Sequence, residues 1–116
     1  MHLATRHNLH SHLFVSPLSN NQEVSAFGEN GSGDDGDNWI VECDSDDFWR
    51  RDEPVRFVHK LTNKFLHVNG DQYGRPIAGQ LEVSAYNYRN AYNLWIVEAG
   101  VYIKPVQPAN EYHNEL

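Results

Sequence analysis

An internal repeat constrains the fold of this 116-residue chain more than any other feature of its sequence. Four blocks recur in the same order, each between 56 and 59 residues further along the chain. The last block, Trp-Ile-Val-Glu at 39–42, returns unchanged at 95–98. The other three pairs are 2–10 with 59–67, 17–18 with 76–77, and 23–27 with 82–86. Such self-similarity indicates one supersecondary unit that is used twice.

The repeated blocks have the composition of short β-strands. They contain Val, Ile and aromatic residues, and clusters of Gly, Pro, Asn and Ser separate them. The pair Asn69-Gly70 predicts a type I′ hairpin turn, and the matched Trp39 and Trp95 predict core positions. Twelve Asn, eight Gly and five Pro disfavour long helices. The sequence therefore predicts an all-β fold with four short strands in each repeat.

The length of the repeat favours a β-trefoil, in which three four-stranded lobes normally close a barrel. Two lobes are predicted here, at residues 1–58 and 59–104, and residues 105–116 read as a tail. A barrel with two of its three lobes leaves strand edges unpaired. We therefore expect the chain to be incomplete, or to complete its barrel by pairing with itself.

Charge and hydropathy exclude two classes of partner. Ten of the 16 acidic residues lie within residues 29–53, where only two arginines oppose them, and the whole chain carries a net charge of −7. Nucleic acid is therefore not expected as a partner, because phosphate contacts need a basic face. No apolar run reaches the roughly 18–20 residues of a membrane helix, and no leader sequence opens the chain. We expect no membrane insertion and no entry signal.

Histidines and acidic residues suggest two candidate metal sites. In both, a structural role of these residues explains their presence better than metal binding does. Residues 34–37 lack the ligand spacing of an EF-hand calcium loop. His10 and His12 share one face of a strand, but the spacing implies no third ligand. His2 and His59 are repeat-equivalent, which indicates shared turn geometry. Since no nucleophile–base pattern or phosphate loop occurs either, we predict no catalysis, no metal and no cofactor.

Six strings spread along the chain carry a family resemblance: residues 8–12, 16–19, 21–28, 55–57, 72–77 and 102–105. The most specific are Asn-Gln-Glu-Val-Ser-Ala-Phe-Gly at 21–28 and Gln-Tyr-Gly-Arg-Pro-Ile at 72–77. Over nearly its whole length the chain resembles the stromal cell-derived factor 2 family, which is built of MIR repeats. These repeats also occur in protein O-mannosyltransferases.

The resemblance implies a β-trefoil of three MIR repeats behind a signal peptide, in a protein of the endoplasmic reticulum lumen. It also implies a noncatalytic role in chaperone complexes with a J-domain co-chaperone and the lumenal Hsp70. There the protein would support the folding and quality control of unfolded or misfolded clients, within the unfolded protein response.

The chain departs from the family pattern at its beginning. By this resemblance we expect residues 1–58 and 59–104 to correspond to the second and third MIR repeats, with the signal peptide and the first repeat missing from this sequence. The last four residues nevertheless resemble a retrieval signal of the endoplasmic reticulum. They are His113, Asn114, Glu115 and Leu116. We expect an amino-terminal truncation of a lumenal protein. The single cysteine, Cys43, could have a partner in the missing part, and its pairing in the complete protein is left open.

The candidate binding residues lie on one turn and at one tryptophan. Tyr and Arg often anchor binding surfaces, and a turn shaped by Gly and Pro is expected to expose them. Trp49 has no repeat mate and is expected to be partly exposed. The structural alternative is a turn whose Tyr packs on its own lobe. The turn residues are Gln72, Tyr73, Gly74 and Arg75.

Three functions remain open at this stage. An adaptor would bind proteins without any dependence on sugar, whereas a lectin-like module would bind O-mannosyl or related glycans through an aromatic such as Tyr73 or Trp49. An isolated structural fragment would bind nothing. The family resemblance favours the adaptor. Asn30 opens an N-glycosylation sequon, usable only if the chain reaches the lumen.

Overall fold

The computed structural model describes residues 1–43, 48–97, 101–102 and 114–115. Its regular elements are strands, apart from two short 3-10 helices, which confirms the all-β class. The strands are β1 (Asn8–Val15), β2 (Gln22–Phe27), β3 (Trp39–Cys43), β4 (Val55–His59), β5 (Phe65–His67), β6 (Ser84–Tyr86), β7 (Val101–Tyr102) and β8 (Asn114–Glu115). The 3-10 helices are η1 (Asp35–Asp37) and η2 (Ala91–Asn93). None of the helices in the described ranges is long and apolar enough to cross a membrane.

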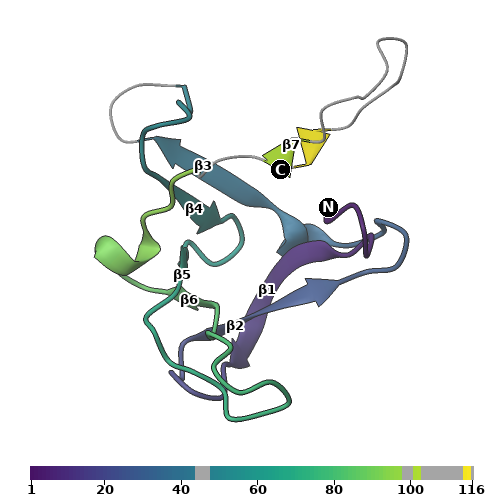
Figure 1. Ribbon diagram of the computed structural model, residues 1–116, viewed down its shortest axis with the longest axis vertical. Coiled ribbons are helices and arrows are strands. Elements are labelled where there is room, and N and C mark those ends of the chain that lie inside the picture. The colour runs from purple at the N-terminus through teal and green to yellow at the C-terminus, as the bar shows by residue number, and fades with distance from the viewer. Residues whose placement is uncertain (44–47, 98–100, 103–113, 116) are drawn as a thin grey trace.

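One antiparallel sheet joins the two repeats (Figure 1). Its strand order is β1-β2-β6-β5-β4-β3. The repeats meet where β2 pairs with β6, with Gln22 opposite Ala85 and Glu23 opposite Ser84, and again where β4 pairs with β5. The strands β1 and β3 form the two edges of this sheet, and β7 pairs separately with β8. Side chains of the first repeat can therefore bond directly to elements of the second.

The turns of the two repeats have the same hydrogen bonds. In the first, the backbone N–H of Arg6 donates to the carbonyl of His2, and in the second Asn63 donates to His59 in the same way. Arg6 and Asn63 both have a φ of +58°. The threonine three residues after each histidine lies 2.9 Å and 2.8 Å, respectively, from the histidine Nδ1. The repeat-equivalent histidines thus share a turn, as the sequence predicts.

The two matched tryptophans are anchored in the same way in both repeats. The indole N–H of Trp39 donates to the carbonyl of Leu9 at 3.0 Å, and that of Trp95 donates to Leu66 at 2.9 Å. Both rings are half-buried, so the prediction that they lie in the core is wrong. Each indole N–H needs an acceptor, and the strand carbonyl that supplies one holds the ring at the margin of the core.

Polar side chains make up much of the interior. Four apolar side chains are buried among the described residues: Val55, Phe65, Leu66 and Ala85. Nine polar ones are buried as well: His10, Ser11, Ser16, Gln22, His59, His67, Glu82, Ser84 and Asn93. Buried polar groups stabilise a fold only when they find hydrogen-bonding partners. The cohesion of the two repeats therefore depends strongly on specific hydrogen bonds.

Two details of the predicted strands and turns are wrong. The fourth repeated block forms β3 in the first repeat, but in the second repeat its described residues, 95–97, form no strand, and Trp95 makes an isolated bridge to Val55. At Asn69-Gly70 only the glycine has a positive φ, of +96°, whereas a type I′ turn needs two. The Asn69 side chain instead accepts a hydrogen bond from the Asp71 N–H at 3.0 Å, as in an Asx turn.

The predicted tail lies largely outside the described residues. Within it, the structure describes β8, whose Asn114 and Glu115 pair with Tyr102 and Val101. The side chains of these four residues are not described. The predicted boundaries at 1–58, 59–104 and 105–116 stay predictions.

Candidate functional site

A groove of about 650 Å³ lies against β1 of the first repeat and is completed by residues from 59–62 at the start of the second. The strands β1 and β2, the helix η1 and the turn after β4 supply its walls. Two acidic side chains, Asp34 and Asp35, and three apolar ones, Leu13, Phe27 and Leu61, line it together with histidines. The groove therefore combines negative charge with apolar surface.

His10 connects the floor of this groove to η1. Its side chain is buried, and its ring stacks on Phe27 with centroids 4.2 Å apart. Its Nδ1 donates to Oδ1 of Asp37 at 2.8 Å and lies 3.6 Å from Oδ1 of Asp34. The sequence did not predict this grouping, because residue 10 lies in the first repeated block and residue 37 lies outside all four blocks.

Both 3-10 helices are closed by the same capping box, with different chemistry. In η1 the Asp34 carboxylate accepts from the N–H of Gly36, and the Asp37 carboxylate accepts from the N–H of Asp34. In η2 the amide oxygens of Asn90 and Asn93 accept the corresponding bonds. The fold therefore forms this cap equally with amides, and the charges at η1 are not needed for it.

His67, which is the counterpart of His10 in the second repeat, makes the same kinds of contact. His67 stacks on Tyr86 with centroids 4.6 Å apart, and its Nδ1 accepts a bond from the Asn93 amide at 3.3 Å. Burial lowers the pKa of His67. In the second repeat, a neutral amide, Asn93, thus takes the place that the Asp37 carboxylate has beside His10 in the first.

His10, Asp34 and Asp37 also offer three metal-ligating atoms within 4.8 Å of one another. His12 does not join them, because its Nε2 donates to Oε1 of Glu23 at 2.6 Å. The prediction of no metal rested on spacing alone, which did not place the two aspartates beside His10. It stays a prediction.

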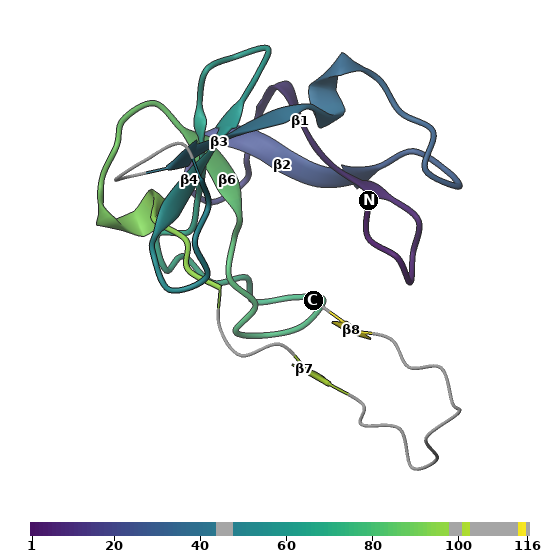
Figure 2. The same ribbon diagram turned by 90° about the horizontal axis from the view of Figure 1, so that it is seen from above.

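The predicted binding turn is part of a hairpin that projects from the sheet between β5 and β6 (Figure 2). The N–H of Tyr73 donates to the carbonyl of Gln80 at 2.8 Å, which closes the hairpin. Gln72, Gly74 and Arg75 are exposed, whereas Tyr73 is half-buried. The structure therefore presents Arg75 outward but gives Tyr73 a partly structural position.

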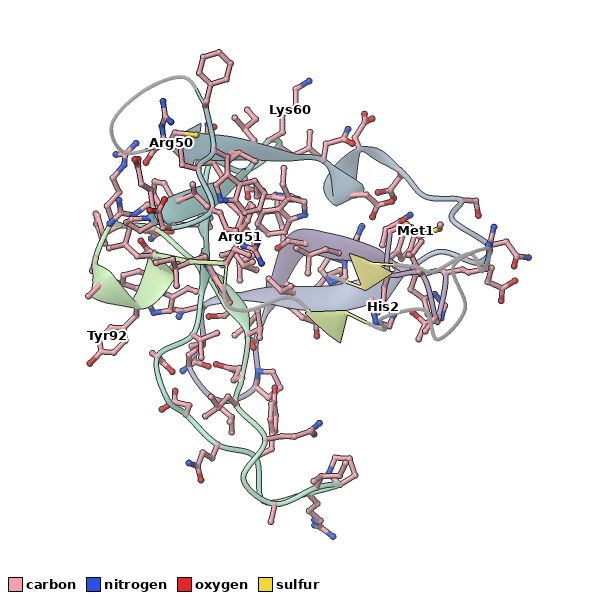
Figure 3. The ribbon with its side chains drawn as sticks, turned by 45° about the horizontal axis from the view of Figure 1, so that its top comes forward. Met1, His2, Arg50, Arg51, Lys60 and Tyr92 are labelled. Atoms are coloured by element: carbon pink, nitrogen blue, oxygen red, sulfur yellow. The ribbon has the colours of Figure 1, made fainter. Side chains whose placement is uncertain are left out.

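Trp49 does not join this hairpin. Its side chain is 46% exposed and packs edge-on against Phe57, with centroids 5.5 Å apart. Figure 3 labels its sequence neighbour Arg50 at the opposite end of the molecule from the hairpin. The two predicted binding features are therefore separate surfaces.

A buried carboxylate, which sequence reasoning missed, anchors the base of the hairpin. Glu82 is 1% exposed and accepts hydrogen bonds from the Ser16 hydroxyl at 2.6 Å, the Leu18 N–H at 2.9 Å and the Ser19 N–H at 3.2 Å. Its own N–H donates to the carbonyl of Asp71 at 2.9 Å. Glu82 thus ties the projecting hairpin of the second repeat to the first turn of the sheet.

Acidification is expected to weaken this anchor. Burial opposes the ionisation of Glu82, but the hydrogen bonds from Ser16, Leu18 and Ser19 outweigh it and lower its pKa below 4.5. The stabilisation is therefore complete above the unfolded-state pKa and is lost as the pH falls through the lower folded-state pKa. Urea unfolding from neutral pH to about pH 3 should show a smaller loss of unfolding free energy for Glu82→Gln than for the wild type. An equal loss in both proteins would contradict this assignment.

The remaining predicted sites lie apart from the groove and the hairpin. Asn30 is exposed in a loop with a φ of +54°, where the sequon is accessible. Cys43 ends β3 with a free, half-buried thiol, in a pocket of about 240 Å³ that Arg56 and Arg89 also line. The side chains of the retrieval-like residues 113–116 lie outside the described part of the chain.

Comparisons with known proteins identify close relatives. No family model matches the chain. It is 53% identical over 115 residues to stromal cell-derived factor 2-like protein 1 of Mus musculus, covering 99% of this chain and 52% of that protein. It is 50% identical over 117 residues to stromal cell-derived factor 2 of Bos taurus, covering 99% and 55%. The chain thus spans about half the length of the curated relatives it matches.

Two solved structures share the fold. The structure of the SDF2-like protein from Arabidopsis thaliana matches with a TM-score of 0.81 and 38% identity, over 92% of this chain and 60% of that one. The S. cerevisiae protein O-mannosyltransferase Pmt1-Pmt2 complex, bound to the sugar donor, matches with a TM-score of 0.72 and 26% identity, over 97% and 17%. These likenesses confirm the predicted all-β, β-trefoil MIR fold.

Proposed function

This chain belongs to the stromal cell-derived factor 2 family, and from that premise we propose that it is a noncatalytic MIR adaptor in chaperone complexes. Its partners would be a J-domain co-chaperone, the lumenal Hsp70 and unfolded or misfolded clients. The observation that carries this proposal is the similarity to stromal cell-derived factor 2 proteins over nearly the whole chain.

The arrangement of the buried polar groups supports a noncatalytic role. The names of the relatives designate no enzyme. Glu82 is engaged by a turn, and His59 donates from Nε2 to the carbonyl of Gly36 and contacts Thr62 through Nδ1, so both hold the fold together. An adaptor instead requires exposed recognition surfaces, and the hairpin at 72–81 and the acidic groove are two such surfaces.

The endoplasmic reticulum lumen is the proposed location. The family membership and the sequence of the last four residues support it, since a retrieval signal is read by a receptor of the secretory pathway. The exposed Asn30 sequon is compatible with modification there.

Affinity purification from lumenal extract tests the adaptor function. The chain, tagged and immobilised, is incubated with the extract, and the retained proteins are identified by mass spectrometry. We expect enrichment of a J-domain protein and of Hsp70, unchanged by free mannose. Retention of neither by a folded chain would contradict the proposal.

A lectin-like role is the second candidate. The likeness to the mannosyltransferase complex bound to its sugar donor favours it. In that case, free mannose would release the retained proteins, and the chain would bind to a mannose column. The same purification therefore separates the two functions.

The hairpin gives a prediction of its own. Arg75 is exposed, so Arg75→Ala should weaken co-chaperone binding about tenfold, which corresponds to about 1.4 kcal/mol, and leave the melting temperature unchanged. Adding Tyr73→Ala should weaken binding further, with some loss of stability because Tyr73 is half-buried. Calorimetric titration and thermal melts measure both effects. If Arg75→Ala lowers the melting temperature and leaves the affinity intact, the hairpin is structural.

A further inference from the structure

We propose that the groove of the first repeat binds a cationic, partly apolar peptide segment of a partner protein. The groove is the cavity of about 650 Å³ beside β1 and η1 that is described above. This inference rests on the proposed adaptor function and specifies the chemistry that a partner presents to it.

The charge of the groove favours a cation. Asp34 is 59% exposed at the side chain, and Asp35 beside it is exposed too, so both carboxylates are available to a ligand. No lysine or arginine is among the residues that line the cavity. Complementary charge steers a partner to such a site and sets its register.

The apolar part of the groove favours a peptide over a small inorganic cation. Leu13 is 81% exposed, Leu61 60% and Phe27 39%. Exposed apolar side chains rimmed by polar ones mark binding surfaces. The aliphatic stems of lysine or arginine pack on such surface while their charged ends reach a carboxylate. The volume lies within the roughly 300–1,000 Å³ of ligand pockets, which is room for several side chains.

The second repeat provides an internal comparison. At the positions of Asp34, Asp35 and Asp37 it has Asn90, Ala91 and Asn93, and it forms the same cap with them. At the position of Leu13 it has a glycine. The carboxylates at η1 and the exposed Leu13 are therefore peculiar to the first repeat, and the second repeat folds without their counterparts. A binding role accounts for this difference.

The comparison also supplies the variant for the test. The triple variant Asp34→Asn, Asp35→Ala and Asp37→Asn copies the second repeat, so it should retain the cap and fold normally. The control variant Glu29→Gln with Asp52→Asn removes two exposed acidic charges that do not line the groove. A third variant, Leu13→Ser with Leu61→Ser, removes exposed apolar surface and keeps the charge.

Fluorescence anisotropy with a labelled eight-residue peptide of alternating lysine and leucine measures the binding, and a glutamate–leucine peptide is the charge control. We expect the lysine peptide to bind in the micromolar range, the triple variant to lose at least about tenfold, and the serine variant to lose about fivefold. The control variant should bind the lysine peptide as tightly as the wild type does. The glutamate peptide should not bind.

Three results would overturn the proposal. The first is undiminished binding by a folded triple variant. The second is the absence of peptide binding while the chain still retains its co-chaperone, which leaves the adaptor function intact. The third is saturable Zn²⁺ binding that is lost in His10→Ala and is unaccompanied by peptide binding, which would assign the groove to a metal. If the wild-type chain bound neither the peptide nor the co-chaperone, the adaptor function would be overturned as well.

Discussion

Replacing Glu82 with alanine is expected to lower the free energy of unfolding by about 3 kcal/mol. The substitution removes a carboxylate that accepts three hydrogen bonds from the first repeat, and it leaves the Ser16 hydroxyl and two backbone N–H groups without their acceptor. The Ser16 side chain is itself buried, so water cannot readily replace the lost partner. The loss should therefore be large for a single substitution.

The repeat supplies the matched control for Glu82. Glu23 occupies the equivalent position, but its side chain is 37% exposed, and its carboxylate bonds to His12. Glu23→Ala should cost less than about 1 kcal/mol, as exposed ion pairs usually do. Urea denaturation of both variants decides the matter. Similar losses for the two would contradict the role given to Glu82.

Replacing His59 with alanine is expected to have the second largest effect, about 2–3 kcal/mol. His59 is fully buried, and its Nε2 donates to the carbonyl of Gly36 at 2.8 Å, which ties the second repeat to η1. Its ring also packs edge-on against Trp39 at 4.8 Å. The variant loses this bond and leaves a cavity.

His2 is the matched control for His59. It has the same turn and the same threonine contact, but it is exposed. His2→Ala should change the free energy of unfolding by less than about 0.5 kcal/mol, as surface substitutions usually do. Thermal and urea unfolding of the pair measure the difference. A large effect at His2, or none at His59, would show that burial between the repeats is not what makes this histidine important.

The local features of the fold could be predicted from the repeat. The turns that follow His2 and His59 match because the same residues recur at the same spacing. The equal bonds of Trp39 and Trp95 to strand carbonyls have the same origin, although their half-buried position could not be read from the residue type. The all-β class could be predicted from the strand-forming residues of the repeated blocks and the turn residues between them.

The contacts between the repeats could not be predicted in this way. Glu23 and Glu82 stand in nearly identical blocks, and only the tertiary structure brings the Ser16 turn onto one of them. The second repeat places His67 and Asn93 at almost the same spacing as His10 and Asp37, but the spacing alone does not show that either pair is in contact.

The role of the groove could not be read from the charge of its segment. The acidic stretch at 29–53 reads as a solvated rim, and Asp34 and Asp35 are indeed exposed. What the sequence does not show is that Leu13 and Leu61, from distant segments, border the same cavity. Charge and apolar surface become one site only when the chain is folded.

The most direct test of the adaptor function is calorimetric titration of the purified chain with a purified J-domain co-chaperone, alone and with the lumenal Hsp70. We predict saturable binding of the co-chaperone that excess mannose does not change and that Arg75→Ala weakens. The absence of binding by a chain that melts cooperatively, or binding that mannose abolishes, would contradict the proposed function.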